Sequence, residues 1–287
     1  MKAKLTFLGT GTSQGVPMIG CDCEVCRSAD PRDKRLRASV LVEYGGITMV
    51  VDCGPDFRYQ MIRAGVKHLD AVLLTHNHKD HTGGLDDIRS FNLLEAKPMN
   101  IYCESYVEQS LRKEYSYAFA EKKYPGAPEW HVHNIDGSKP FRVYSNECEE
   151  KLVWESGYGY HKVEAEQPAV AKSVEVVPIH GWHHKEKVLS VLGYRFGNIA
   201  YLTDMKWVED LEFDKLKGLD AVTINCVKRT PHHSHMSLAE AYAFFEKVGA
   251  KESYITHISH MLPAHADFAA EMPEGIFPAY DGLVLEY

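Results

Sequence analysis

Apolar and polar positions alternate along this chain in two ways, as short runs typical of strands and as longer runs with helical spacing. Strand patterns are expected at residues 4–8, 39–43, 48–52, 71–75, 100–103, 174–179, 193–196, 199–203, 221–226, 253–256 and 282–286. Helical spacing is expected at residues 56–64, 85–95, 106–119, 211–216 and 237–248. Because the two kinds of element alternate in both halves and no low-complexity linker divides the chain, the pattern predicts an α/β or α+β sandwich with helices on the outside.

Two stretches lack a clear pattern. Residues 124–133 contain Pro, Gly and Trp and are expected to form a loop. Residues 145–172 are rich in Glu, Tyr and Gly and exceed a typical connection, which predicts an insertion within one domain spanning residues 1–287. Such an insertion is either a functional lid or a tolerated surface loop, and its residues favour neither.

A cluster of metal-ligating side chains follows the apolar run at residues 71–74. His76, His78, Asp80 and His81 lie within six positions, where a turn at a strand end can direct all four into one small volume. Imidazole and carboxylate groups suit Zn²⁺, Mn²⁺ or Fe²⁺, and four ligands are enough to be shared between two ions. The segment therefore predicts a metal site.

Further candidate ligands stand at the ends of other expected strands. His183, Asp204 and His257 each follow a strand pattern, and Asp52 ends the run at residues 48–52. In a sandwich these strand ends can converge on one rim. Together with the first cluster they would complete the coordination of two ions.

The cysteines suggest a separate zinc site. Cys21, Cys23 and Cys26 have C-x-C-x-x-C spacing near residues 20–27, which bridges poorly into disulfides but suits a tetrahedral Zn²⁺ that needs one more ligand. The chain has 7 cysteines, an odd number. In a reducing compartment this number favours thiols and metal ligands over a disulfide framework.

The order of these candidate ligands resembles the ligand pattern of the metallo-β-lactamase superfamily. That pattern is the run Thr-His-Asn-His-Lys-Asp-His followed by a distant His, an Asp and a final His. The resemblance implies an αββα sandwich, with two mixed β-sheets and helices on the outer faces. It also implies one ion held by His76, His78 and His183, a second held by Asp80, His81 and His257, Asp204 bridging both, and Asp52 orienting a ligand histidine. His180 and His184 remain alternatives to His183.

Two features resemble the PhnP family of phosphodiesterases, which open cyclic ribose phosphates. They are the cysteine spacing and the opening Leu8-Gly9-Thr10-Gly11-Thr12-Ser13-Gln14-Gly15-Val16-Pro17. The resemblance implies that His260 completes the zinc site of Cys21, Cys23 and Cys26. It also implies that His235, just before an expected helix with a capping box at Ser237, acts near the leaving group. Arg35 and Arg37 could help to hold a phosphate, although surface charge is the favoured interpretation.

The implied activity is hydrolysis of small (cyclic) phosphodiesters. A hydroxide between two active-site metals, Zn or Mn, would attack phosphorus, with His235 and Asp80 as catalytic residues and one further structural Zn. Three alternatives remain: a tRNA 3′-processing nuclease, an ester or thioester hydrolase of the same fold, and a non-catalytic metal-stabilised binding protein.

Composition narrows these alternatives. A net charge of −8 and a pI near 6.0 make nucleic acid an unlikely partner and favour a small-molecule phosphodiester. The chain has no apolar run of membrane-spanning length and no secretory signal pattern, so we expect a cytoplasmic protein without a membrane partner. A homodimer is possible.

Overall fold

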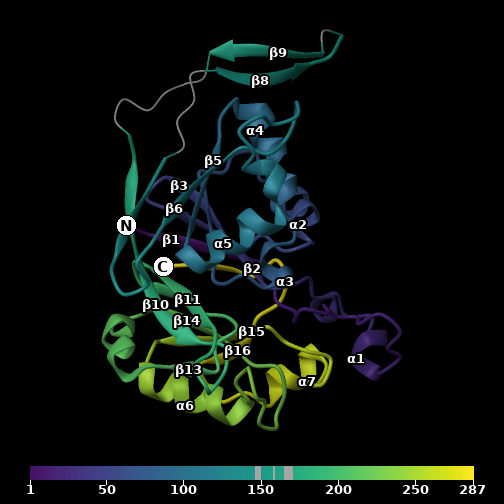
Figure 1. The fold of residues 1–287 in the computed structure, drawn as a ribbon. Helices are drawn as coiled ribbons and strands as arrows, with labels where there is room; N and C mark the ends of the chain where they lie inside the picture. Colours follow the sequence, from purple (N-terminus) through teal and green to yellow (C-terminus); the bar gives the residue numbers. More distant parts are fainter. Residues whose placement is uncertain (146–149, 158, 165–170) are drawn as a thin grey trace.

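The computed structural model describes residues 1–145, 150–157, 159–164 and 171–287. Two mixed β-sheets pack face to face, with helices α2, α4 and α5 on one outer side and α6 and α7 on the other (Figure 1). This order of layers confirms the expected αββα sandwich. None of the helices in this part of the chain has the length and apolar character needed to cross a lipid bilayer.

The first sheet has seven strands in the order β17-β1-β2-β3-β4-β5-β6. Their bounds are Val284–Glu286 (β17), Ala3–Gly9 (β1), Ser39–Tyr44 (β2), Ile47–Val51 (β3), Ala71–Leu73 (β4), Met99–Cys103 (β5) and Trp130–Asn134 (β6). Strands β1 to β3 pair antiparallel, and β3 to β6 pair parallel. Gly45 and Gly46, with φ of 59° and 79°, form the tight turn between β2 and β3, where both residues need a positive φ.

The second sheet has eight strands, in the order β13-β10-β11-β12-β14-β15-β16 with β7 also paired to β10. Their bounds are Trp207–Val208 (β13), Ser173–Trp182 (β10), Ser190–Phe196 (β11), Ile199–Tyr201 (β12), Ala221–Asn225 (β14), Glu252–Thr256 (β15), Ile276–Pro278 (β16) and Phe141–Tyr144 (β7). Strands β12, β14, β15 and β16 run parallel. A separate hairpin consists of β8 (Glu150–Glu155) and β9 (Gly159–Glu164), and β8 lies against α4 (Figure 1).

Seven α-helices connect these strands within the described residues. They are Glu24–Arg27 (α1), Phe57–Ala64 (α2), Lys79–Thr82 (α3), Arg89–Glu95 (α4), Ser105–Glu114 (α5), Leu238–Val248 (α6) and His265–Ala270 (α7). Four segments are 3₁₀-helical: Pro31–Asp33, Leu85–Ile88, Ser116–Ala118 and Asp210–Leu216. Helix α6 begins at a capping box between Ser237 and Glu240, as expected, and ends at Gly249 in the left-handed conformation.

The hydrophobic core between the sheets positions the functional rim. Phe7 of β1 packs edge-on against Tyr201 of β12, with ring centroids 6.3 Å apart, and both side chains are fully buried. Burying each such side chain stabilises the fold by about 2–3 kcal/mol. The hydroxyl of the buried Tyr194 donates a 2.6 Å hydrogen bond to the carbonyl of Leu74. This bond joins the second sheet to the point where the expected metal-ligand segment begins.

The structure departs from the predicted elements mainly in the middle of the chain. The expected loop at residues 124–133 contains the start of β6, a sheet-edge strand whose burial pattern is irregular. The expected insertion at residues 145–172 contains the β8–β9 hairpin, while its residues 146–149, 158 and 165–170 lie outside the described part of the chain. The segment expected as a helix at residues 211–216 is a 3₁₀-helix.

Arg35 is not a surface charge, contrary to the favoured interpretation. Its side chain is buried and donates hydrogen bonds to the Thr10 hydroxyl (2.9 Å) and to the Ala279 carbonyl (2.6 Å). Arg37 pairs instead with Asp56 at 3.1 Å. Because the donors of Arg35 are used inside the protein, this side chain joins the N-terminal segment to the C-terminal strands.

An ion triad beside the first sheet gives a stability prediction. His68 contacts Asp70 at 2.9 Å and Glu95 at 2.8 Å, and hydrogen bonds to these carboxylates raise its pKa from 6.5 to about 10. The contribution of protonated His68 to the free energy of unfolding is therefore fully present below pH 6.5 and is lost as the pH rises towards about 10. We expect His68→Ala to destabilise the protein by about 1 kcal/mol at pH 6, since the side chain is half exposed and screened. The penalty should shrink at pH 10.

Urea unfolding at the two pH values measures this difference. His131→Ala, an exposed histidine on β6, is the matched control and should show no such pH dependence. A His68→Ala penalty equal at pH 6 and pH 10 would contradict the prediction.

Candidate metal centre

The expected ligands converge where strands of both sheets end. Asp52 follows β3, the segment Thr75–His81 follows β4, His183 follows β10, Asp204 follows β12 and His257 follows β15. The carboxyl ends of parallel strands meet at one edge of a sheet, and the two packed sheets bring their edges together. Asp52, Asp204 and His257 have φ of 66°, 58° and 55°. Left-handed backbone at non-glycine residues is strained, and such strain clusters at functional sites.

Eight side chains come within ligand distance of one another in overlapping groups. His76, His78 and His183 form one group, whose ligand atoms lie within 4.8 Å of each other. Asp80, Asp204 and His257 form another, and Asp204 also groups with His76 and His81 and with His183 and His235. One oxygen of Asp204 is 3.2 Å from both His81 Nε2 and His257 Nδ1. Asp204 thus lies at the centre, where a bridging ligand would stand.

The chemistry of these atoms fits divalent metal ions. His76 Nε2, His81 Nε2 and His257 Nδ1 are buried without a hydrogen bond, which is costly unless another partner binds them. Burial holds the pKa of His76 well below its ordinary value and lowers that of His183 to about 4, so both rings are neutral, as metal ligands must be. Burial opposes charge on His81, but Asp204, Asp80 and Asp52 raise its pKa well above the ordinary value. A divalent ion would take the place of that proton.

Neighbouring groups fix the orientation of the ligand rings. The buried Asp52 carboxylate accepts a 2.7 Å hydrogen bond from His81 Nδ1 and also binds the backbone N–H (2.9 Å) and hydroxyl of Thr75. On the other side, His183 Nδ1 donates to the backbone carbonyl of Ser234 at 2.9 Å. Each contact leaves Nε2 of the ring facing the site, which is the usual arrangement around bound metals.

The structure distinguishes among the neighbouring histidines. His183 belongs to two of the ligand groups, whereas His180 and His184 belong to none within the described residues. His180 Nε2 contacts the Ser190 hydroxyl at 3.1 Å instead. The geometry therefore favours His183 at the third ligand position.

His235 faces the same site from the loop before α6. Its ring stacks on that of His257, with centroids 4.8 Å apart, and its Nδ1 is 3.7 Å from Asp204 Oδ1. Burial and the neighbouring His257 lower the pKa of His235 to about 2. A neutral ring in this place can donate a hydrogen bond to a group bound at the site.

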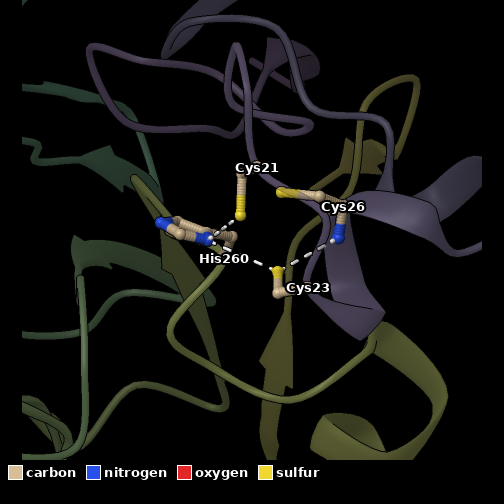
Figure 2. A group of neighbouring side chains, drawn as sticks. All are labelled: Cys21, Cys23, Cys26 and His260. Carbon is tan, nitrogen blue, oxygen red and sulfur yellow. Dashed lines mark hydrogen bonds between the residues drawn. The ribbon is translucent and has the colours of Figure 1, made fainter.

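A second cluster joins the cysteine loop to the segment after β15. The thiols of Cys21, Cys23 and Cys26 and Nδ1 of His260 face one another, as Figure 2 shows, with all four atoms within 4.8 Å. His260 Nδ1 is 3.3 Å from Cys21 Sγ and 3.4 Å from Cys23 Sγ. A hydrogen bond from the backbone N–H of Cys26 and the contact with His260 lower the pKa of Cys23 to about 6. Three thiols and one imidazole match a closed tetrahedral zinc site.

Ser234 is a functional residue that sequence reasoning missed. It acts through its backbone carbonyl, and a carbonyl is present at every position, so the sequence carries no signal for it. Thr75 stands inside the recognised motif, but its part in holding Asp52 depends on the distance between β3 and β4 in the fold.

The chain is similar to known proteins in sequence and in fold. Residues 48–258 match the Beta-lactamase superfamily domain. The crystal structure of a diphosphatase from the PhnP family has 35% identity and a TM-score of 0.80, covering 100% of this chain and 98% of the other. Human tRNase Z, short form, has a TM-score of 0.61 at 17% identity, covering 98% of each chain, which shows a shared fold.

One relative in sequence is about twice as long as this chain. The octanoyltransferase of Porphyromonas gingivalis is 36% identical over 279 residues, which make up 96% of this chain and 50% of that protein. The chain therefore spans half the length of this relative.

Proposed function

Since the chain belongs to the metallo-β-lactamase superfamily and, within it, to the PhnP family of hydrolases, we propose that it is a phosphodiesterase that acts on small phosphodiesters. The observation that carries the proposal is the convergence of six other proposed ligand side chains on Asp204, with His235 beside them. This arrangement combines a set of donors for two ions with one neutral imidazole that is free to contact the substrate.

The proposed assignment uses each ligand once, except Asp204. His76, His78 and His183 would hold one divalent ion, Zn or Mn, and Asp80, His81 and His257 the other, with Asp204 shared. Cys21, Cys23, Cys26 and His260 would hold a structural zinc. When bound, a pair of ions lowers the pKa of water and offsets the charge that develops on phosphoryl oxygens.

The protein's own residues orient the reaction. Asp52 and the Ser234 carbonyl hold His81 and His183 so that Nε2 faces the site. The neutral ring of His235 is placed to donate a hydrogen bond to the phosphodiester. A water oxygen forms a bond to phosphorus as the bond from phosphorus to the leaving group breaks, and the departing oxygen keeps the electron pair and receives through His235 the proton that the water gives up.

Three other functions are less well supported. A tRNA nuclease would bind a large polyanion, which a chain with net charge −8 does not attract in general. Octanoyl transfer belongs to a relative of which this chain spans only half, so transfer or hydrolysis of an acyl group is the second candidate. A purely structural protein would have no need to bury several ring nitrogens without a hydrogen bond around Asp204.

One panel of substrates tests the proposal. The purified protein with Mn²⁺ or Zn²⁺ is assayed on bis(p-nitrophenyl) phosphate, a ribose cyclic phosphate, precursor tRNA and p-nitrophenyl octanoate. We expect turnover of the small diesters and none of the tRNA or the octanoate. Cleavage of tRNA alone, or of the octanoate alone, would replace the proposal by the nuclease or the acyl hydrolase, and no turnover of any substrate would also contradict it.

A further inference from the structure

The candidate ligands His76, His78 and His183, which we term the first ligand group, come from both sheets. His78 follows β4 of the first sheet and His183 follows β10 of the second, yet their ring centroids are 4.8 Å apart. A polar neighbour contacts Nδ1 of His76 (2.9 Å), His81 (2.7 Å) and His183 (2.9 Å). No such contact holds the ring of His78 in the part of the chain that the structure describes, so its position depends on the backbone that carries it.

Side chains of helix α5 hold the residues on either side of His78. The side-chain amide of Asn77 donates a 3.2 Å hydrogen bond to the hydroxyl of Ser110, and Glu114 forms an ion pair with Lys79. The Ser110 hydroxyl in turn donates to the Glu114 carboxylate at 3.5 Å. The backbone of His78 is therefore fastened to α5 at the positions before and after it.

The start of the same helix is tied to the second sheet. The hydroxyl of Tyr106 donates a 2.6 Å hydrogen bond to the carbonyl of Ser190, the first residue of β11. Ser190 pairs with Trp182, the last residue of β10, and His183 is the next residue of the chain. This contact therefore fixes α5 to the strand end that carries His183.

One face of α5 thus connects the two sheets at the first ligand group. Tyr106, Ser110 and Glu114 recur at intervals of four positions, so they lie one above the other on the helix. From the first to the last of them the helix extends about 12 Å, at about 1.5 Å per residue. A hydrogen-bonded helix keeps this length, so contacts at its two ends constrain the separation of His78 and His183.

The ligands of the other proposed ion are held by different contacts. The backbone carbonyl of His81 accepts a 2.8 Å hydrogen bond from the N–H of Cys53, which follows β3. His257 precedes Ile258, whose N–H donates a 2.8 Å hydrogen bond to the carbonyl of Thr10. A loss of the α5 contacts should therefore act mainly on the first ligand group.

On the basis of the metal assignment in the proposed function above, we propose that one face of α5 sets the spacing of His78 and His183 for their shared ion. The positioning residues are Tyr106, Ser110 and Glu114, none of which belongs to a ligand group. Ligands that are already correctly spaced lose less conformational freedom when an ion binds, so their spacing contributes to affinity. Replacement of supporting residues around a metal typically lowers its affinity 10- to 100-fold.

Zinc binding measured step by step tests this role. The purified protein is equilibrated with a series of buffered free Zn²⁺ concentrations, and the zinc bound per chain is counted at each. The step that is missing in His78→Ala identifies the ion of the first ligand group. The variants compared are Tyr106→Phe, the pair Ser110→Ala with Glu114→Gln, and Ser110→Thr, which keeps the hydroxyl.

We expect Tyr106→Phe and the double variant each to raise the Kd of this step by about tenfold and to leave the other zinc steps unchanged. Their kcat on bis(p-nitrophenyl) phosphate should be lower than that of the wild type at limiting Zn²⁺ and equal to it at saturating Zn²⁺, which a general loss of structure would not produce. Ser110→Thr should keep the wild-type Kd.

The matched control is Glu108→Gln on the same helix. Glu108 forms an ion pair with Arg112 at 2.6 Å, so this substitution breaks a comparable contact away from the metal centre. The control should keep the wild-type Kd for every zinc step.

The outcomes separate this inference from the function on which it rests. A Kd of the identified step that stays at the wild-type value in the α5 variants, or zinc steps that all weaken together, overturns the positioning role, as does a His78→Ala protein that lacks no step. Zinc binding is measured without substrate. A selective shift in a protein that hydrolyses no phosphodiester therefore supports the positioning role while it contradicts the phosphodiesterase proposal.

Discussion

Replacing His78 by alanine should abolish phosphodiester hydrolysis while the fold and the cysteine-loop zinc persist. His78 supplies one of the three imidazoles of its ligand group, and its ring is 4.6 Å from that of His76 and 4.8 Å from that of His183. Two imidazoles hold a divalent ion far more weakly than three, and the loss of supporting residues alone costs 10- to 100-fold in metal affinity. We therefore expect kcat/KM on bis(p-nitrophenyl) phosphate to fall by more than about 100-fold.

Metal analysis and thermal unfolding complete this experiment. His78→Ala should contain less active-site metal than the wild type, retain the zinc of the cysteine loop and melt at a similar temperature. His131→Ala should match the wild type in all three respects. Full activity in the His78→Ala protein would show that the metal assignment is wrong.

Replacing Cys23 by serine should act on folding. The cysteine loop and His260 are more than 230 positions apart in the sequence, and their four side chains hold the N-terminal segment to the end of β15. Structural zinc sites contribute directly to folding free energy because the unfolded chain has no preformed site. We expect Cys23→Ser to lose its zinc and to lower the free energy of unfolding by about 4 kcal/mol, with poor solubility as the visible result.

The matched control is Asp22→Asn, in the same loop but with an exposed side chain outside the ligand group. Urea unfolding with and without a chelator separates the effects. The chelator should destabilise the wild type and the control more than Cys23→Ser, because only the first two also lose the zinc of the cysteine loop. A Cys23→Ser protein that keeps zinc and wild-type stability would disprove the structural role.

The sequence predicts which side chains gather at the candidate metal centre better than it predicts the elements around them. His76, His78, Asp80 and His81 are recognisable because a turn after one strand carries all four, so their proximity needs no knowledge of the tertiary fold. The zinc loop is recognisable for the same reason. His183, Asp204 and His257 need the family pattern, since only the packing of two sheets brings their strand ends together.

Features that depend on distant partners were missed. Strand β6 lies at a sheet edge, where one of its residues is buried and one is half-buried. Its sequence therefore lacks the alternation of apolar and polar residues that is typical of a strand. Arg35 resembles a surface residue because nothing local shows that Thr10 and Ala279 surround its guanidinium.

His257 and His260 lie three positions apart, and one serves each proposed metal site. Closing the cysteine loop around His260 restricts the backbone that must hold His257 in its left-handed conformation. An ion bound at one centre would therefore reduce the conformational freedom of this segment. Less freedom is then left to lose when an ion binds at the other centre. Affinities linked in this way are reciprocal, so we expect the proposed active-site ions and the proposed structural zinc to bind cooperatively, each bound more tightly when the other is present.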